Sequence, residues 1–236
     1  PSPLQKVSEA ECFLAASLET SGLVALAGTG SFVHGRRPDG RWITAGGAGP
    51  VIGDDGSGFD LGIRAIRATC LAASLDHYRG PLVDAVMDEF GCQQRWDLVT
   101  LYHHEHPSRQ RIAGLAPLVT RHAEAGDPVA LGILDEAARA LAQIARAVVD
   151  QLGLHRVRTV ILAGGTASSS AYQEALRAHL QPIFPRPVDI RRPKYRPAVG
   201  SALIALKYLG VDWSGALIDQ LDAELADHGL GGAAKE

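Results

Sequence analysis

Short apolar runs bounded by Gly, Pro or Asp alternate with longer segments of helical periodicity along this chain of 236 residues. The short runs predict five strands, at residues 23–27, 31–35, 41–44, 159–162 and 188–190. A Pro38-Asp39-Gly40 turn separates the second run from the third. The first three strands are therefore close together in the sequence, and the last two follow a long helical region.

Apolar residues three and four positions apart predict helices in the remaining segments. The longer predicted helices cover residues 8–18, 59–78, 128–152, 171–180, 197–209 and 215–226, and shorter helical segments lie between 81 and 125. Ser8 stands three residues before Glu11, which is the spacing of a capping box. The last six residues, GGAAKE, follow the final helix and are expected to be disordered.

The order of these elements predicts the fold class. Three antiparallel strands, a large helical insertion and then alternating helix and strand form the element order of an RNase H-like layered α/β domain. The helix at 8–18 precedes this complete domain, so we expect it to be the last element of a missing N-terminal domain. We therefore divide the chain into residues 1–22, the RNase H-like domain at 23–210, and a C-terminal helix with a flexible tail at 211–236.

Composition narrows the functional classes. Hydrophobic residues make up 46% of the chain, enough for a sizeable core, and the net charge of −3 gives no electrostatic footprint for nucleic acid. The three cysteines are an odd number without CxxC spacing, which favours free thiols in a reducing compartment. Neither a membrane-spanning run nor a signal-peptide pattern is found in the sequence, so we expect a cytoplasmic protein.

Two glycine-rich turns each follow a predicted strand. Gly28-Thr29-Gly30-Ser31 places two glycines and two hydroxyls at the tip of a hairpin, where backbone N–H groups and hydroxyls suit phosphate oxygens. Ala163-Gly164-Gly165-Thr166 leads from a buried strand into a helix, whose N-terminus favours an anion. The structural alternatives are a hairpin turn that needs glycine for its backbone angles and a tight strand-to-helix connection capped by Ser.

Four motifs in order identify a family resemblance. They are GLVALAGTGSFVHG, GGAGPVIGDDGSGFDLG, VILAGGTAS and RPAVGSALIAL. As a set they resemble the BadF/BadG/BcrA/BcrD ATPase family, and within it the N-acetylglucosamine kinase branch, over residues 8–210. The resemblance implies membership of the actin, sugar-kinase and Hsp70 superfamily, in which two RNase H-like domains close on ATP and an acceptor.

The resemblance assigns roles to both glycine-rich turns. Gly28, Thr29, Gly30 and Ser31 resemble the second phosphate loop, which lies against the β- and γ-phosphates of ATP. Gly164, Gly165 and Thr166 resemble the adenosine motif. The segment 198–202 resembles a connecting segment whose small residues let two helices cross closely at the hinge between the domains.

The resemblance also predicts acceptor-binding residues. Asp54, in Gly53-Asp54-Asp55-Gly56-Ser57, matches the first acid of the family motif Gly-Asp-Glu-Gly-Ser, which hydrogen-bonds the sugar. The alternative is that Asp54 and Asp55 only cap the helix that begins near residue 59. Gly47 and Ala48 are expected to flank the sugar, but the kinases usually carry Trp where this chain has Ala48. The loss of that ring puts N-acetylglucosamine itself in doubt as the substrate.

Glu9 stands where the sugar-kinase branch carries an aspartate that acts as general base. A glutamate can accept a proton equally well but places its oxygens one methylene further out. The alternative is that Glu9 is an early-helix acid that favours the helix dipole. The His103-His104-Glu105-His106 run is not expected to hold a metal, because neighbouring side chains at a helix end do not converge. The basic run 191–196 could approach a phosphate, but we expect it to be a solvated loop.

The function implied by the resemblance is ATP-dependent phosphoryl transfer to a sugar or amino sugar, with Mg²⁺ held chiefly through the other domain. One alternative is an ATPase that activates acyl-CoA dehydratases, which requires paired cysteines for an iron–sulfur cluster. Another is a non-catalytic sugar- or nucleotide-binding module, which Glu9 and Ala48 favour. We expect Leu14 and the helix at 198–205 to form an apolar surface that meets the missing domain, or a second copy in a homodimer.

Overall fold

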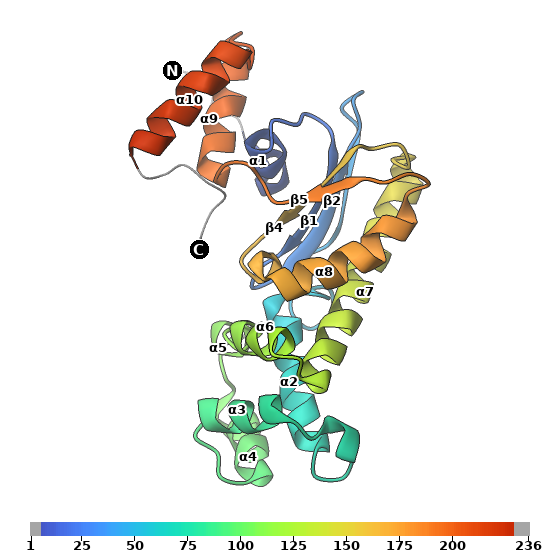
Figure 1. The fold of residues 1–236 in the computed structure, drawn as a ribbon, viewed down its shortest axis with the longest axis vertical. Helices are drawn as coiled ribbons and strands as arrows, with labels where there is room; N and C mark the ends of the chain where they lie inside the picture. The colour runs from blue at the N-terminus through green and yellow to red at the C-terminus, as the bar shows by residue number, and fades with distance from the viewer. Residues whose placement is uncertain (1–5, 229–236) are drawn as a thin grey trace.

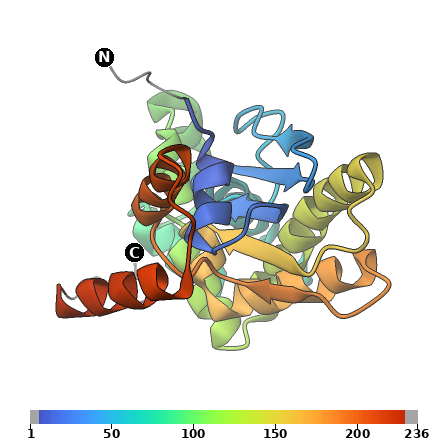
Figure 2. The same ribbon diagram turned by 90° about the horizontal axis from the view of Figure 1, so that it is seen from above.

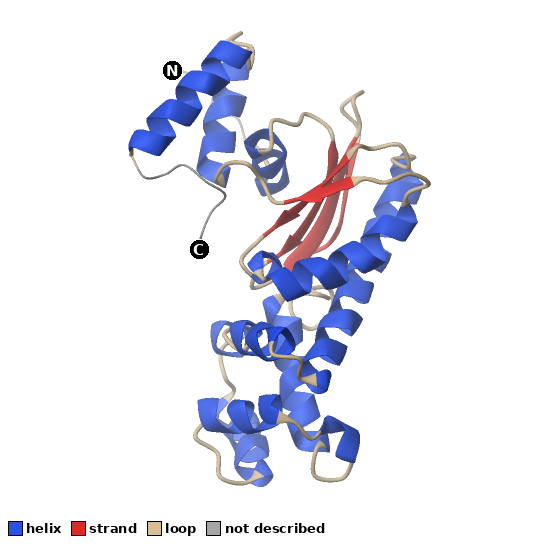
Figure 3. Cartoon of the chain, in the orientation of Figure 1, coloured by secondary structure: helices blue, strands red, loops and turns tan. Residues whose placement is uncertain are grey.

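A five-stranded mixed sheet is the centre of the computed structural model, which describes residues 6–228 (Figures 1 and 3). The strands are β1 (Gly22–Ala27), β2 (Ser31–Arg36), β3 (Trp42–Gly46), β4 (Thr159–Ala163) and β5 (Asp189–Arg191), in the order β3-β2-β1-β4-β5. The first three pair antiparallel, and β4 and β5 extend the sheet in parallel from β1. This arrangement confirms the predicted strands and the RNase H-like α/β fold class.

Helices pack on both faces of the sheet (Figure 2). On one face, α7 (Pro128–Leu152) and α8 (Ser170–Leu180) cover alternate strand residues such as Leu23, Ala25 and Leu162. On the other face, α1 (Glu9–Ala16) covers Val24, Leu26 and Ile161 through Phe13 and Leu14. Burial on both faces explains why the strand at 23–27 is apolar throughout instead of alternating.

A block of helices lies beyond one end of the sheet, in the lower half of Figure 1. It contains α2 (Gly58–Leu71), α3 (Pro81–Glu89), α4 (Arg95–Glu105), α5 (Arg109–Ala113) and α6 (Ala116–Glu124). Short 3₁₀ turns, at Asp76–Tyr78, Thr166–Ser168 and Gln181–Ile183, complete the loops of the domain. None of the helices within residues 6–228 has the length and apolarity needed to cross a membrane.

The prediction of one helix over 59–78 is wrong, because α2 ends at Leu71. Two arginine side chains from later in the chain donate hydrogen bonds to backbone carbonyls at the C-terminal end of α2. Arg95 donates to the carbonyl of Cys70 at 3.0 Å, and Arg79 donates to that of Ala72 at 3.2 Å. Helix-end carbonyls satisfied in this way need no further turn.

Two C-terminal helices, α9 (Pro197–Tyr208) and α10 (Gly215–Asp227), pack beside α1 at the opposite end of the molecule from the helical block (Figures 1 and 2). A Cβ on Gly200 would overlap the carbonyl oxygen of Cys12, so α9 crosses α1 with backbone nearly touching backbone. The predicted close crossing at 198–202 is confirmed. The expectation that Leu14 forms an exposed apolar surface is wrong, because this side chain packs against the sheet. The expected disorder of GGAAKE concerns residues outside the described range.

Candidate functional site

The carboxyl ends of β1 and β4 open into a cleft of about 1020 Å³. These strands are parallel neighbours, so the turns that follow Ala27 and Ala163 lie side by side at one edge of the sheet. The cleft is lined by α1, the segment 192–197, α5 and α6 as well. All but one of the predicted site residues line it: Glu9, Gly28, Thr29, Gly30, Ser31, Gly47, Asp54, Gly164, Gly165 and Thr166.

The carbonyl of Gly28 connects three segments of the cleft through hydrogen bonds. It accepts hydrogen bonds from the N–H of Gly58 at 2.7 Å and from the hydroxyl of Thr166 at 3.1 Å. Gly58 is the first residue of α2, and Thr166 belongs to the turn after β4. The hairpin tip, the start of α2 and the second glycine-rich turn therefore hold one another in place.

Glycine is required where the two turns meet. Gly164 has a φ of +92°, and a Cβ there would overlap the carbonyl oxygen of Ala27. A Cβ on Gly28 would meet nothing nearer than Gly164 Cα and Gly30 O, both at 4.0 Å. The space beside the first turn is open, as the approach of a phosphate to the backbone requires, so the residues present fit a nucleotide.

Asp54 is a buried carboxylate in the cleft lining, with 3% of its side chain exposed. Its Oδ2 accepts from Nη2 of Arg109 at 2.6 Å, and its Oδ1 accepts from the N–H of Ser31 at 3.4 Å. The cap of α2 is Ser57, whose hydroxyl accepts from the N–H of Asp60 at 3.1 Å. The interpretation of Asp54 as a helix cap is therefore wrong.

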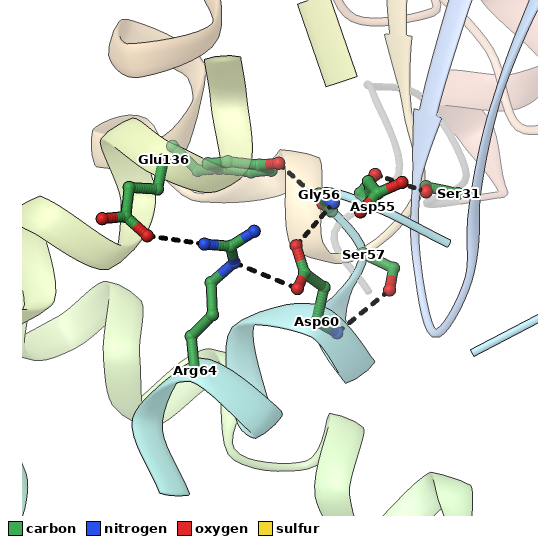
Figure 4. Close-up of polar contacts among 8 residues, drawn as sticks. Ser31, Asp55, Gly56, Ser57, Asp60, Arg64 and Glu136 are labelled. Carbon is green, nitrogen blue, oxygen red and sulfur yellow. Dashed lines mark hydrogen bonds and ion pairs between the residues drawn. The ribbon is translucent and has the colours of Figure 1, made fainter. Parts of the chain in front are cut away.

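The exposed neighbour, Asp55, plays a different part. Its backbone carbonyl accepts from the hydroxyl of Ser31 at 2.6 Å, which fixes the loop at 53–57 to the hairpin tip (Figure 4). Its side chain does not belong to the cleft lining and does not cap α2.

A network of hydrogen bonds and ion pairs holds the loop at 53–57 (Figure 4). The N–H of Gly56 donates to Asp60 at 2.8 Å, Asp60 pairs with Arg64 at 3.0 Å, and Arg64 pairs with Glu136 of α7 at 2.6 Å. The hydroxyl of Tyr172 donates to the carbonyl of Gly56 at 2.6 Å. Burial raises the pKa of Tyr172, so the phenol remains a donor. The loop that carries Asp54 is thus anchored to three helices.

Glu9 lies in the first turn of α1, exposed, and lines the cleft. The predicted capping box is confirmed: the hydroxyl of Ser8 accepts from the N–H of Glu11 at 3.2 Å, and Glu11 accepts from the N–H of Ser8 at 3.0 Å. Glu11 thus completes the cap. Glu9 keeps both interpretations, as a first-turn acid and as a base facing the cleft.

Of the two residues expected to flank the sugar, Gly47 lines the cleft and Ala48 does not. The N–H of Gly47 donates to the carbonyl of Gly53 at 2.8 Å, and Gly47 lines the cleft. Ala48 is exposed, lies against Gly53 and is not in the lining. Contact of Ala48 with a sugar stays a prediction.

Several lining residues come from elements in which sequence motifs indicated no site. Arg109, Thr120 and Glu124 come from α5 and α6 of the helical block, and Glu124 accepts from the hydroxyl of Ser170 at 2.8 Å. Arg192 also lines the cleft, so the expected solvated loop at 191–196 holds only in part. Within the described range, no group of three or more His, Cys, Asp or Glu residues is placed to hold a metal ion.

Comparisons with known proteins give a consistent result. The model of the BadF/BadG/BcrA/BcrD ATPase family matches residues 7–205. An N-acetylmuramic acid/N-acetylglucosamine kinase of Clostridium acetobutylicum is 33% identical over 202 residues, covering 84% of this chain and 66% of that protein. An N-acetyl-D-glucosamine kinase of Dictyostelium discoideum is 28% identical over 189 residues, covering 78% of this chain and 59% of that protein.

Solved structures agree with these relatives. A crystal structure from Chromobacterium violaceum, described as a candidate N-acetylglucosamine kinase, has a TM-score of 0.65 at 32% identity and covers 84% of this chain and 64% of that one. The chain therefore spans less than two thirds of the length of each of these relatives.

Proposed function

The chain belongs to the BadF/BadG/BcrA/BcrD ATPase family, and from this premise we propose that it carries the nucleotide and acceptor sites of an ATP-dependent amino-sugar kinase. The observation that carries the proposal is the convergence of predicted residues from separate segments on one cleft at the carboxyl ends of β1 and β4. Phosphoryl transfer depends mainly on positioning and charge stabilisation, which such a cleft can provide.

The nucleotide half of the site consists of the two glycine-rich turns. ATP, when bound with Mg²⁺, supplies the phosphoryl group, and we expect the metal to be held chiefly through phosphate oxygens and a further domain. Thr29 and Ser31 present hydroxyls, and the turn at 28–31 presents backbone N–H groups, toward phosphate oxygens. The turn at 164–166 admits the adenosine closely because Gly164 and Gly165 carry no side chain.

The acceptor half of the site is built around Asp54. A carboxylate can accept from two adjacent sugar hydroxyls, and the network behind Gly56 holds this one in position. Glu9 accepts the proton of the attacking hydroxyl. The names of both relatives include N-acetylglucosamine, which supports an N-acetylated amino sugar as acceptor.

Two alternatives have less support. The relatives reported above are described as sugar kinases, and Cys12 and Cys92 are buried, so they do not present the interface thiolates that the cluster of a dehydratase activator would need. A non-catalytic binding module would bind nucleotide and sugar without turnover. Use of ATP and free thiols also fits our expectation of a cytoplasmic protein.

The proposal is tested on the full-length natural protein with ATP, Mg²⁺ and a panel of glucosamine, N-acetylglucosamine and N-acetylmuramic acid. We expect ADP release that depends on at least one amino sugar. Gly28→Ala should weaken ATP binding about tenfold or more, because its methyl group fits the fold but occupies the space beside the phosphate loop.

Gly132→Ala is the matched control, because Gly132 lies on α7 and its Cβ would meet no atom within 4 Å. Binding of nucleotide and sugar without turnover would favour the non-catalytic module.

A further inference from the structure

Arg109 connects the two halves of the proposed site. Its Nη2 lies 2.6 Å from Oδ2 of Asp54, the carboxylate assigned to the acceptor. A Cβ on Gly30 would overlap the same Nη2, so the guanidinium lies directly over the phosphate loop. One side chain therefore touches the acceptor-binding acid and covers the turn assigned to the β- and γ-phosphates.

The exposure of the two partners is unequal. The side chain of Asp54 is 3% exposed, whereas that of Arg109 is 40% exposed. Arg109 and Arg192 are the cationic side chains in the described lining of the cleft, which also holds the acids Glu9, Asp54 and Glu124. The buried acid thus needs Arg109, while the half-exposed cation still faces the cleft.

The helix that carries Arg109 is held firmly. Ile112 of α5 is buried, and a Cβ on Gly62 of α2 would overlap its carbonyl oxygen, so α5 lies against the backbone of α2. The hydroxyl of Ser108 accepts from the N–H of Arg111 at 3.1 Å and fixes the first turn of α5. Because α2 begins at the acceptor loop, Arg109 and Asp54 are positioned by the same element.

We propose that Arg109 donates hydrogen bonds to the phosphoryl group during its transfer, an inference that rests on the kinase function proposed above. The acceptor hydroxyl oxygen forms a bond to the γ-phosphorus, while the bond from that phosphorus to the bridging oxygen breaks and its electron pair leaves with ADP. The hydroxyl proton passes to the carboxylate of Glu9. Arg109 gives up no atom and stabilises negative charge on the equatorial oxygens.

The geometry of a guanidinium suits both contacts at once. The bond to Asp54 uses Nη2, and the planar group carries five N–H donors. Arg109 can therefore keep its carboxylate partner while it turns other donors toward the phosphoryl oxygens. A guanidinium can also bind the carboxylate of an acidic sugar, such as the lactyl group of N-acetylmuramic acid. The experiment below distinguishes this carboxylate from the phosphoryl group as the anion that Arg109 binds.

The test compares Arg109→Gln and Arg109→Lys in the full-length natural protein with N-acetylglucosamine, which is neutral, and N-acetylmuramic acid, which is anionic. For each sugar that the wild type phosphorylates, we expect Arg109→Gln to lower kcat about 100-fold or more, with the KM for that sugar changed only a few-fold. Arg109→Lys should retain part of kcat, because lysine keeps the positive charge although it lacks the planar set of donors of a guanidinium. Added guanidinium ion should partly rescue Arg109→Ala.

Arg111→Gln is the matched control. Arg111 lies on the same helix, with its side chain 47% exposed, near Glu105 at 3.8 Å and over the ring of Phe90 at 5.0 Å. It does not line the cleft, so kcat should stay near the wild-type value. Equal thermal midpoints of the variants would show that α5 keeps its place.

Three outcomes would overturn the inference. A higher KM for sugar with unchanged kcat would make Arg109 a positioning residue for Asp54 only. A loss confined to N-acetylmuramic acid would assign the guanidinium to the sugar carboxylate. A wild-type protein that phosphorylates none of the sugars would overturn the kinase proposal itself, and this inference with it.

Discussion

Asp54 offers the clearest test at the scale of single residues, because its neighbour differs from it in burial. We expect Asp54→Asn to weaken sugar binding about 10- to 100-fold, since it removes a charge-assisted acceptor, and to leave ATP affinity nearly unchanged. Calorimetry with N-acetylglucosamine and with ATP measures both. Asp55→Asn is the control, because that side chain is exposed and outside the cleft lining. Equal effects of the two substitutions would contradict the assignment.

The role of Glu9 gives a second prediction for a single residue. If Glu9 accepts the proton, Glu9→Gln should lower turnover by about two orders of magnitude with ATP binding unchanged, whereas Glu9→Asp should keep most of the activity. If Glu9 only favours the dipole of α1, the glutamine variant should lose a few tenths of a kcal/mol of stability and no turnover. Steady-state kinetics beside a urea denaturation series distinguishes the two roles.

The burial of His34 leads to a prediction of how the free energy of unfolding changes with pH. It is buried on β2, with Nδ1 at 2.8 Å from the hydroxyl of Thr44, and burial lowers its pKa below the ordinary value of 6.5 although Glu11 opposes this shift. The unfolded chain therefore binds the proton first, so the stabilisation is complete above pH 6.5 and is lost as the pH falls below it. The positive charge of Arg36 also lowers the pKa of His34.

The measurement is the free energy of unfolding between pH 5 and 8 for the wild type, His34→Gln and His104→Gln. The slope below pH 6.5 should be smaller in His34→Gln, which has no group to protonate. His104→Gln, a change at an exposed residue, should keep the wild-type slope. An unchanged slope in His34→Gln would assign the pH dependence to other groups.

At the scale of elements, the crossing of α1 and α9 depends on one glycine. A methyl group on Gly200 would overlap the backbone of Cys12, so Gly200→Ala should separate the helices and cost about 1–3 kcal/mol. Gly132→Ala makes the same chemical change on α7 in open space and should be neutral or stabilising by up to about 1 kcal/mol. Chemical denaturation of both variants tests the contrast, and equal midpoints would contradict it.

Elements governed by local sequence were predicted well, and those governed by distant partners were not. The strands, the capping box at Ser8 and the glycine-rich turns follow from neighbouring residues, and each was found. The early end of α2 depends on Arg79 and Arg95, and the burial of Leu14 depends on the sheet. No local pattern marks these contacts.

The same distinction applies to the site. The glycines of the two turns and Asp54 belong to recognisable sequence motifs, and these residues line one cleft. Arg109 and Glu124 come from short helices of the insertion, and only the packing of α5 on α2 and the position of α6 bring them to the cleft. Periodicity predicts a helix there but cannot show which of its faces meets a loop many residues away.

At the scale of the whole molecule, the cleft has walls from the sheet edge, α1 and the helical block, and the relatives reported above are longer than this chain. In two-domain kinases, closure of the second domain aligns the acceptor and excludes water from the transferring phosphoryl group. We therefore predict that residues 1–236, expressed alone, bind ATP weakly and do not phosphorylate amino sugars at a useful rate.

Exposed apolar residues of α9 and its C-terminal end support the same prediction. Tyr208 and Leu209 are 61% and 79% exposed, and Ala198, Ala202 and Ala205 are exposed along the helix. A second domain or a second copy of the chain would cover this surface. Sedimentation and ADP release should be measured on the same sample of residues 1–236. Rapid phosphorylation by a monomer would show that the walls described here suffice, and activity that rises with self-association would assign a further wall of the site to a partner copy.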